Sequence, residues 1–290
     1  MKLVDLGYTS DLENYRIKNN LSNFEVARVI TEHKERYVVK NETGDFEAEL
    51  IGNLRFTAQD RSDFPAVGDW VAISEYDINK ALIHHVFPRT SIIERQAVGK
   101  HGQTQIIATN IDVGFILQAV NRDFSINRLE RYLTICNASK VRPIIILTKI
   151  DLLAKSELEV LLQSVSERIK NVEIIAISNE TSEGIESVKS RIKKGNTYCL
   201  LGSSGVGKST LINSISEKEV MKTGAISESI DRGKHVTTHR ELIVLENGGI
   251  IIDNPGMREI GVTETSGGLE VTFETIFELA NQCRFSDCTH

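Results

Sequence analysis

The sequence lacks the features that would place the protein in a membrane or outside the cell. No run of apolar residues approaches the roughly 20 that a helix needs to cross a bilayer. Residues 1–20 are largely polar and contain acidic residues, unlike a signal or transit peptide. The chain has only four cysteines, and without a secretory signal these favour reduced thiols in the cytoplasm.

An excess of positive charge is also absent. The formal net charge at pH 7 is −6, so bulk charge alone would not hold the protein on nucleic acid. A local basic face that meets a large RNA–protein partner is compatible with this balance.

Residues 24–90 have the pattern of a small antiparallel β-barrel. Short runs with alternating apolar residues are separated by turn-forming segments at 41–44 and 65–68. The runs are VARVI (26–30), RYVVK (36–40), FEAEL (46–50) and DWVAI (69–73). For most of the aromatic residues here we favour core packing over base stacking. These aromatic residues are Phe24, Tyr37, Phe46, Phe56, Phe64, Trp70, Tyr76 and Phe87.

From residue 106 to residue 265 the pattern changes. Apolar runs typical of strands buried on both faces alternate with segments whose apolar residues recur at three and four positions. The runs are 112–120, 142–149, 172–178, 198–202 and 249–253, and the helical segments include 127–139 and 156–170. This order predicts a parallel sheet covered by helices on both sides.

We therefore expect a multidomain chain with five parts. An N-terminal extension (1–23) precedes the barrel (24–90), and a polar linker (91–105) follows it. An α/β domain (106–265) precedes a C-terminal element (266–290).

The segment Gly202–Ser209, GSSGVGKS, matches the P-loop pattern G-x-x-x-x-G-K-[ST]. It follows an apolar strand and opens a helical segment, which is the context that the motif requires. Backbone N–H groups at the helix start would bind phosphates, Lys208 would reach the β and γ oxygens, and the Ser209 hydroxyl would bind Mg²⁺. We conclude that the protein binds a nucleotide, in preference to a glycine-rich turn without a ligand.

The segment Thr148–Asp151, TKID, ends a buried run and resembles the [NT]KxD motif of GTPases. Its aspartate would accept hydrogen bonds from guanine N1–H and the exocyclic amine, a donor pair that adenine lacks, and its lysine stem would lie along the purine. Ser178 and Asn179, at the end of the next run, resemble the loop that supports the base. Thr148 replaces the commoner Asn, which leaves open whether the usual hydrogen bond to the P-loop forms.

Two further segments would complete the phosphate and Mg²⁺ site. DNPG (253–256) fits the DxxG pattern, in which Asp253 binds Mg²⁺ through water and the Gly256 N–H meets the γ-phosphate. Between this motif and the P-loop, Thr237 or Thr238 could complete the Mg²⁺ coordination. An exposed loop with incidental threonines is the alternative.

Met257 follows DNPG, where Ras-like enzymes place a glutamine that orients water. A thioether cannot orient water, so we expect slow intrinsic hydrolysis unless another group or a partner supplies this function. His235 is the nearest candidate, because an imidazole can transfer protons near neutral pH. A solvated loop histidine is an equally weighted alternative.

The C-terminal residues Cys283, Cys288 and His290 have the C-x4-C-x-H spacing of zinc ligands. A structural zinc site needs four ligands, so we favour a fourth ligand beyond residue 290 over incidental cysteines. Cys136 and Cys199 lie in apolar segments and are expected as small core residues.

The order of the motifs differs from that of ordinary GTPases, in which the P-loop comes first and [NT]KxD near the end. Here TKID precedes GSSGVGKS and DNPG. The same sheet can form from either order, because circular permutation is tolerated where the original termini are close. Both switch segments then lie near the C-terminus, and DNPG runs almost directly into the zinc element.

With these residues the chain resembles the circularly permuted small ribosomal subunit biogenesis GTPases, the RsgA family. The resemblance covers nearly the whole chain: Val67-Gly-Asp-Trp70, the permuted motif series, RGKHVTTHREL (232–242) and CRFSDCTH (283–290). It implies an OB-fold barrel, a P-loop GTPase domain and a C-terminal zinc domain. It also implies binding to the small ribosomal subunit and its rRNA late in assembly, with slow GTP hydrolysis that the subunit stimulates. We expect a monomer without a membrane partner.

These arguments give three sets of site residues. GTP or GDP is expected to contact Thr148, Lys149, Ile150, Asp151, Ser178, Asn179, Gly202, Ser203, Ser204, Gly205, Val206, Gly207, Lys208, Ser209, Thr210, Asp253 and Gly256. Catalytic roles are expected for Lys208, Ser209, Thr238 and His235. Metal ligands are expected at Ser209, Thr237, Thr238 and Asp253 for Mg²⁺, and at Cys283, Cys288 and His290 for Zn²⁺.

Three functions compete at this point. The leading one is GTP hydrolysis that times a step of ribosome assembly. The second is a GTP-sensing module that binds the ribosome, with incidental turnover. The third is a P-loop kinase or ATPase, for which ATP would compete with GTP.

Overall fold

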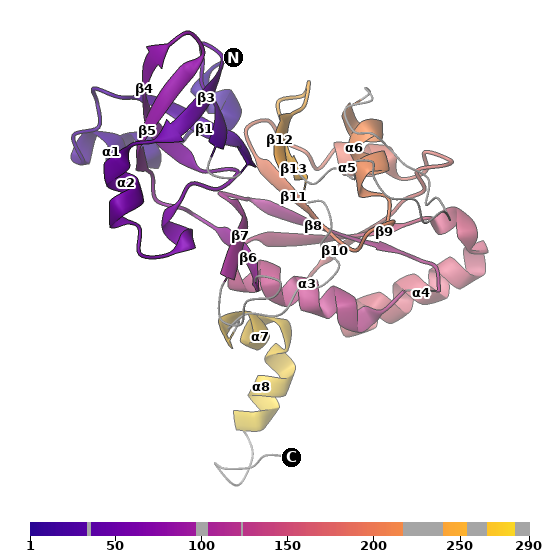
Figure 1. The fold of residues 1–290 in the computed structure, drawn as a ribbon. Helices are drawn as coiled ribbons and strands as arrows, with labels where there is room; N and C mark the ends of the chain where they lie inside the picture. Colours follow the sequence, from indigo (N-terminus) through magenta and orange to yellow (C-terminus); the bar gives the residue numbers. More distant parts are fainter. Residues whose placement is uncertain (34–35, 97–103, 123, 217–239, 254–265, 282–290) are drawn as a thin grey trace, which may run out of the picture.

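The architecture is that of a computed structural model of the chain, which describes residues 1–33, 36–96, 104–122, 124–216, 240–253 and 266–281. Within these ranges the chain forms a β-barrel, an α/β domain and two C-terminal helices (Figure 1). No helix in the same ranges is long and apolar enough to span a membrane.

Five short strands close into a barrel near the N-terminus. They are β1 (Glu25–His33), β2 (Arg36–Lys40), β3 (Asp45–Leu50), β4 (Trp70–Asp77) and β5 (Lys80–Val86). The pairing order is β1-β2-β3-β5-β4, and β4 pairs again with β1, so the sheet closes on itself. The predicted barrel is confirmed, but β3 and β5 pair in parallel. This happens because α2 (Gly52–Thr57) and η2 (Arg61–Asp63) carry the chain from β3 to β4 before β5 returns beside β3.

Most of these aromatic side chains are packed in a core, as the sequence predicted, but they divide between two clusters. Those that are at most 5% exposed are Tyr37, Phe46, Trp70 and Phe87. Phe64 is partly buried and packs against the cluster of Tyr37 and Phe46. Phe24 is partly buried and packs against a second cluster, in which Trp70 and Phe87 lie with Leu6 and Leu12 of the N-terminal extension. Phe56 and Tyr76 differ, with exposed fractions of 91% and 54%, so core packing does not account for these two rings.

The α/β domain contains a sheet in the order β10-β9-β8-β11-β13-β12. Its strands are β8 (Val113–Ala119), β9 (Arg142–Thr148), β10 (Glu173–Ala176), β11 (Thr197–Leu201), β12 (Glu241–Val244) and β13 (Ile250–Asp253). Neighbours from β10 to β13 pair in parallel, and β12 runs antiparallel to β13. β8 and β11 are buried along their whole lengths, because helices cover both faces.

The helices lie on opposite faces of this sheet (Figure 1). Their bounds are α3 (Ile126–Ala138), η3 (Ile150–Leu152), α4 (Lys155–Arg168), α5 (Ile185–Lys189) and α6 (Lys208–Ser216). α3 and α4 contribute to one core cluster, which includes Cys136 and Cys199, and α5 and α6 contribute to the other. Both cysteine side chains are fully buried in the first cluster, as predicted for small core residues.

The barrel and the α/β sheet are joined edge to edge. β1 pairs antiparallel with β12 through Thr31 and Glu241, which makes one continuous sheet of eleven strands. Beside this contact, the guanidinium of Arg240 donates to the carbonyl of Ile106 at 2.9 Å. β12, which follows Thr237 and Thr238 in the sequence, is therefore paired with the barrel strand β1.

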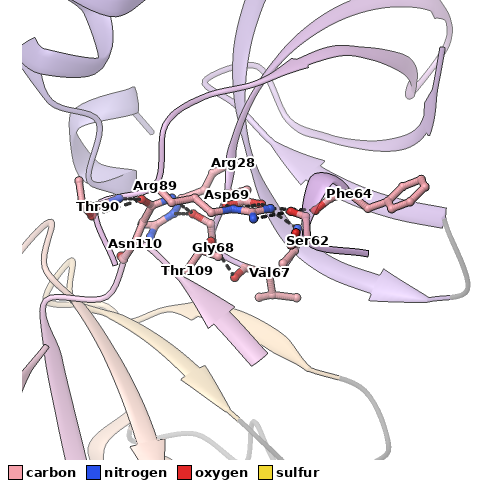
Figure 2. Close-up of polar contacts among 11 residues, drawn as sticks. Arg28, Ser62, Phe64, Val67, Gly68, Asp69, Arg89, Thr90, Thr109 and Asn110 are labelled. Atoms are coloured by element: carbon pink, nitrogen blue, oxygen red, sulfur yellow. Dashed lines mark hydrogen bonds and ion pairs between the residues drawn. The ribbon is translucent and has the colours of Figure 1, made fainter. Parts of the chain in front are cut away.

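A buried arginine fixes the joint between the two domains (Figure 2). Arg28 is 1% exposed and donates to the backbone carbonyls of Leu6 at 2.5 Å, Gly68 at 3.1 Å and Asn110 at 3.1 Å. Its guanidinium also lies 5.4 Å from the centre of the Trp70 ring. One side chain thus connects the N-terminal extension, the barrel and the start of the α/β domain.

A second arginine holds the loop between β3 and β4 (Figure 2). Arg89 forms a buried ion pair with Asp69 at 2.7 Å and donates to the carbonyls of Ser62 at 2.6 Å and Phe64 at 2.8 Å. Asp69 also accepts the N–H of Ala66 at 2.8 Å. The Asp69 carboxylate therefore has both a charged partner and a backbone N–H donor.

Asn110 completes the joint. Its side-chain amide donates to Gly68 O at 3.1 Å, and its side-chain oxygen accepts the N–H of Thr90 at 2.9 Å. Its φ of 54° is a left-handed value that asparagine adopts more readily than most residues. Next to it, Thr109 N–H donates to Val67 O at 3.1 Å.

The flanking segments are also ordered into elements. The N-terminal extension holds η1 (Leu3–Leu6) and α1 (Ser10–Lys18), and the expected linker at 91–105 overlaps β6 (Ile92–Gln96) and β7 (Thr104–Thr109), which pair with each other. At the other end, α7 (Ser266–Thr272) packs on α3, and α8 (Glu274–Asn281) extends away from the sheet (Figure 1). Asn137 in α3 donates to the Thr272 hydroxyl at 3.0 Å.

Candidate nucleotide-binding site

The nucleotide motifs gather at one edge of the sheet. TKID follows β9, Ser178 and Asn179 follow β10, the P-loop follows β11, and Asp253 ends β13. These strands are parallel, so their carboxyl ends lie at the same edge. Ligands of open α/β sheets bind there.

Glycine is required where the P-loop leaves β11. Gly202 has a φ of 153°, and a Cβ at this residue would lie 2.5 Å from the backbone oxygen of Leu117. Gly205 and Gly207 have φ values of 79° and 96°. These values let the loop curl so that successive N–H groups can face one anion.

Lys208 is the first residue of α6 and lies inside the loop. Its ammonium donates to the carbonyls of Gly202 at 2.7 Å and Ser203 at 2.8 Å, and the residue is 8% exposed. Burial lowers the pKa of Lys208, and the nearby Asp253 carboxylate opposes that change. The loop itself therefore holds the ammonium inside the turn where the sequence predicts the phosphates.

Two oxygen side chains at the same edge fit a magnesium ion. Ser209 is the second residue of α6, and Asp253 is 3% exposed at the end of β13. Hydroxyl and carboxylate oxygens are ligands that Mg²⁺ prefers, with water and phosphate oxygens completing the octahedron. Across the described ranges, no group of three or more His, Cys, Asp or Glu side chains forms a metal cluster.

Thr148 makes the contact to the P-loop that the sequence left open. Its side chain is fully buried, and its hydroxyl donates to the carbonyl of Val206 at 2.7 Å. The hydroxyl thus makes a hydrogen bond to the P-loop without the amide of the commoner asparagine.

The next residues of TKID turn the chain beside β10. Lys149 has a left-handed φ of 62°, and the N–H of Ile150 donates to Ile177 O at 3.3 Å. Asp151 then lies exposed, and its carboxylate accepts the Ser178 hydroxyl at 2.5 Å. One carboxylate oxygen is oriented by this bond, and the group is accessible to a base.

The Ser178 hydroxyl is itself held in place. It accepts the backbone N–H groups of Glu180 at 3.2 Å and Thr181 at 3.1 Å. On the P-loop side, the Asn179 amide donates to Gly207 O at 3.4 Å. The loop after β10 therefore contacts both Asp151 and the P-loop.

Two residues near the P-loop were not found from the sequence. Tyr132 in α3 is 4% exposed and forms a hydrogen bond with the Ser203 side chain, and burial raises the pKa of its phenol. Gln118 in β8 is 2% exposed, and neither polar atom of its side chain has a hydrogen-bond partner. A helical pattern marks Tyr132 as inward-facing, but no sequence signal identifies its neighbour.

The remaining site residues lie outside the described part of the chain. They are His235, Thr237, Thr238, Gly256, Met257, Cys283, Cys288 and His290. Their expected roles stay predictions.

Comparison with known proteins gives a family match. The family model described as RsgA GTPase matches residues 86–263. The chain is 40% identical over 290 residues to Small ribosomal subunit biogenesis GTPase RsgA 2 of Lactiplantibacillus plantarum, covering all of this chain and 80% of that protein. It is 42% identical over 291 residues to RsgA 1 of Listeria innocua, with the same coverage.

Solved structures share the fold. YjeQ from Thermotoga maritima aligns with a TM-score of 0.65 and 23% identity, over 91% of this chain and 86% of that one. YloQ, described as a circularly permuted GTPase, aligns with a TM-score of 0.65 and 24% identity, over 92% of this chain and 84% of that one. The barrel and the permuted order of the sheet are thus features of known proteins.

Proposed function

Because the chain belongs to the RsgA family of GTPases, we propose that it hydrolyses GTP during assembly of the small ribosomal subunit. One observation carries the proposal: the P-loop, the base-reading motif and Asp253 lie at one sheet edge although their order is permuted. Relatives that cover the full length of this chain are named for small subunit biogenesis. We propose a cytoplasmic monomer that binds the subunit and its rRNA.

The P-loop and Lys208 would stabilise the charge that develops during phosphoryl transfer. The Lys208 ammonium is already held by two loop carbonyls, so little reorganisation is needed when the phosphates bind. Phosphoryl transfer depends largely on positioning and on such electrostatic stabilisation. Mg²⁺, bound by Ser209 and Asp253 with Thr237 or Thr238, would neutralise the charge on the phosphate oxygens.

Asp151 would select guanine. Its carboxylate is oriented by Ser178 and can accept two hydrogen bonds from guanine N1–H and N2–H. Adenine would leave the carboxylate without these donors. Asp151→Asn should weaken GTP binding about 100-fold or more, since two hydrogen bonds to a charged group are lost. Unchanged affinity, or competition by ATP, would contradict the base assignment and favour a kinase or ATPase.

Hydrolysis by the protein alone should be slow, because Met257 cannot orient water. We propose that His235 or a group on the subunit supplies this function. Single-turnover hydrolysis with and without purified small subunits tests the proposal, and acceleration of about tenfold or more is expected. Equal rates, with binding to the subunit still dependent on GTP, would favour the GTP-sensing module.

A zinc site is proposed for Cys283, Cys288 and His290, with a fourth ligand supplied beyond residue 290. The relatives that match the whole chain are longer than it, since the chain covers 80% of each. Metal analysis of the full-length protein should find about one zinc per chain. Its absence would leave the cysteines as incidental residues.

A further inference from the structure

The end of β9 and the loop after β10 each hold the P-loop by one of two consecutive backbone carbonyls. The hydroxyl of Thr148, the last residue of β9, donates to Val206 O at 2.7 Å. The Asn179 side-chain amide, after β10, donates to Gly207 O at 3.4 Å. Both contacts reach the last turn of the P-loop before α6 begins at Lys208.

The second carbonyl is the one that starts the helix. Gly207 O also accepts the N–H of Leu211 at 2.9 Å, which is the first hydrogen bond inside α6. A carbonyl oxygen has two lone pairs and can accept both donors. A contact from Asn179 therefore fixes the helix start whose free N–H groups face the phosphates.

The Asn179 amide packs closely against the backbone of Gly207. Gly207 has a φ of 96°, and a Cβ added there would lie 2.8 Å from the Asn179 amide nitrogen. The Asn179 side chain thus rests directly on the P-loop backbone. The oxygen of the same side chain is buried without a hydrogen-bond partner. Such a group destabilises the fold, so stability alone does not account for this asparagine.

Another residue of this loop contacts Asp151, the residue expected to read the base. Ser178 donates to Asp151 at 2.5 Å, and the two N–H groups that follow hold its hydroxyl. Thr148 has a single hydroxyl donor, which bonds Val206 O. It therefore has no second donor for the neighbouring carbonyl.

We propose that Asn179 is a positioning residue for the P-loop, and that it shares with Thr148 the clamp on two consecutive carbonyls. This inference rests on the proposed GTP site and deepens it. Because Asn179 fixes the P-loop backbone that would bind the phosphates, it should affect the binding of every nucleotide alike. Selection of guanine is left to Asp151, which Ser178 orients.

The test compares Asn179→Ala with wild type in titrations with GTP, GDP and inosine triphosphate, which lacks the 2-amino group. Loss of one hydrogen bond to the loop should raise the Kd for GTP and GDP about two- to tenfold. The ratio of Kd values for inosine triphosphate and GTP should stay the same. The thermal midpoint of the nucleotide-free protein should not fall, because a buried unpaired oxygen is removed.

Rescue gives the decisive measurement. Thr148→Asn in the Asn179→Ala background returns an amide to the clamp and should restore most of the lost GTP affinity. Asn53→Ala, which removes an exposed amide on α2, is the matched control and should change neither affinity nor midpoint.

Three outcomes would overturn the inference. An unchanged Kd for Asn179→Ala would show that the contact is not used, and a changed inosine-to-guanine ratio would make Asn179 a base reader. A lower thermal midpoint without rescue by Thr148→Asn would make it a purely structural residue. Failure of the wild-type protein to bind GTP is a separate result, which would contradict the site itself.

Discussion

The domain joint and the nucleotide edge both contain buried polar side chains, but these side chains differ in whether they have hydrogen-bond partners. At the joint, Arg28 has three carbonyl acceptors, and Asp69 has Arg89 and a backbone N–H. At the nucleotide edge, both polar atoms of Gln118 and the side-chain oxygen of Asn179 are buried without a hydrogen-bond partner. Arg28 and Asp69 at the joint thus have partners within the described chain, whereas Gln118 and the Asn179 oxygen at the edge have none.

This difference matches what each region must do. A buried polar group without a partner costs about 1–3 kcal/mol. A joint between domains binds no ligand, so unpaired groups there would only destabilise the fold. A binding site completes its interactions only when the ligand is present. Side chains that lower the stability of the ligand-free protein are therefore concentrated at such sites. We therefore expect substitutions in the two regions to act in opposite directions on stability.

The largest effect is expected for Arg28→Met. This change leaves the buried carbonyl of Leu6 without its 2.5 Å donor and Asn110 O without its 3.1 Å donor. Burial lowers the pKa of Arg28 to about 10, with Asp112 and Asp69 opposing, so the guanidinium is charged at neutral pH and both carboxylates lose its attraction. We expect a loss of about 3–5 kcal/mol, measured by urea unfolding. Arg55→Met, at an exposed site on α2, should change stability little, and a similar loss in both variants would contradict the role of the joint.

The next effect is expected for Gly68→Ala, which changes the joint without removing a polar group. Gly68 has a φ of 98°, and a Cβ there would lie 2.3 Å from Thr109 O and 3.2 Å from the Ile252 side chain. The backbone must shift, and the bonds from Arg28 and Asn110 to Gly68 O shift with it. We expect a loss of about 2–3 kcal/mol in the same assay. Gly44→Ala has no atom within 4 Å of its new Cβ and should be neutral or slightly stabilising, because alanine lowers the entropy of the unfolded chain. An equal loss there would contradict the steric explanation for Gly68→Ala.

The sequence predicts the strands at the nucleotide edge but not the contacts of the domain joint. The strands that end in TKID and GSSGVGKS are recognisable because burial on both faces gives them continuous apolar runs. The joint is not recognisable, because it depends on contacts such as Arg28 with Asn110, which are 82 residues apart. Nothing in the local pattern marks an arginine within an apolar strand as a residue that bonds three carbonyls.

The same limit applies inside the site. Motif spacing places Thr148 and Asn179 at the ends of neighbouring strands, but hydrogen-bond partners depend on how the two loops turn. Lys149, with its left-handed φ of 62°, sets one of these turns, and lysine is not a residue that predicts it. The contact between Thr148 and Val206 therefore appears only in three dimensions.

The nucleotide edge should respond in the opposite sense, and Gln118→Met is the test. Methionine has nearly the same length and removes two buried atoms that have no partner. We expect the nucleotide-free protein to gain about 1–2 kcal/mol in urea unfolding. Gln163→Met, at an exposed position on α4 where the amide bonds Glu167 at 2.8 Å, is the control and should be near neutral. Loss of stability in Gln118→Met would show that the amide is satisfied in solution and would remove the contrast with the joint.

The smallest effect is expected for Glu32, a carboxylate beside the β1–β12 contact. It sharpens the comparison because the nearby arginines do not fully offset the cost of burying its charge. Burial raises the pKa of Glu32 above its usual value of 4.5, while Arg240 and Arg61 oppose and Asp69 adds to the increase. The folded state therefore holds this proton more tightly than the unfolded state does, so the stabilising contribution is complete below pH 4.5 and is lost as the pH rises through the folded pKa. Glu32→Gln imitates the protonated form and should match wild type near pH 4 and exceed it slightly at pH 7. Urea unfolding of both proteins between pH 4 and 8 measures the difference. A variant that is less stable than wild type at pH 7 would mean that the attraction of Arg240 and Arg61 outweighs the burial of the carboxylate, and the joint would then be satisfied at this residue as well.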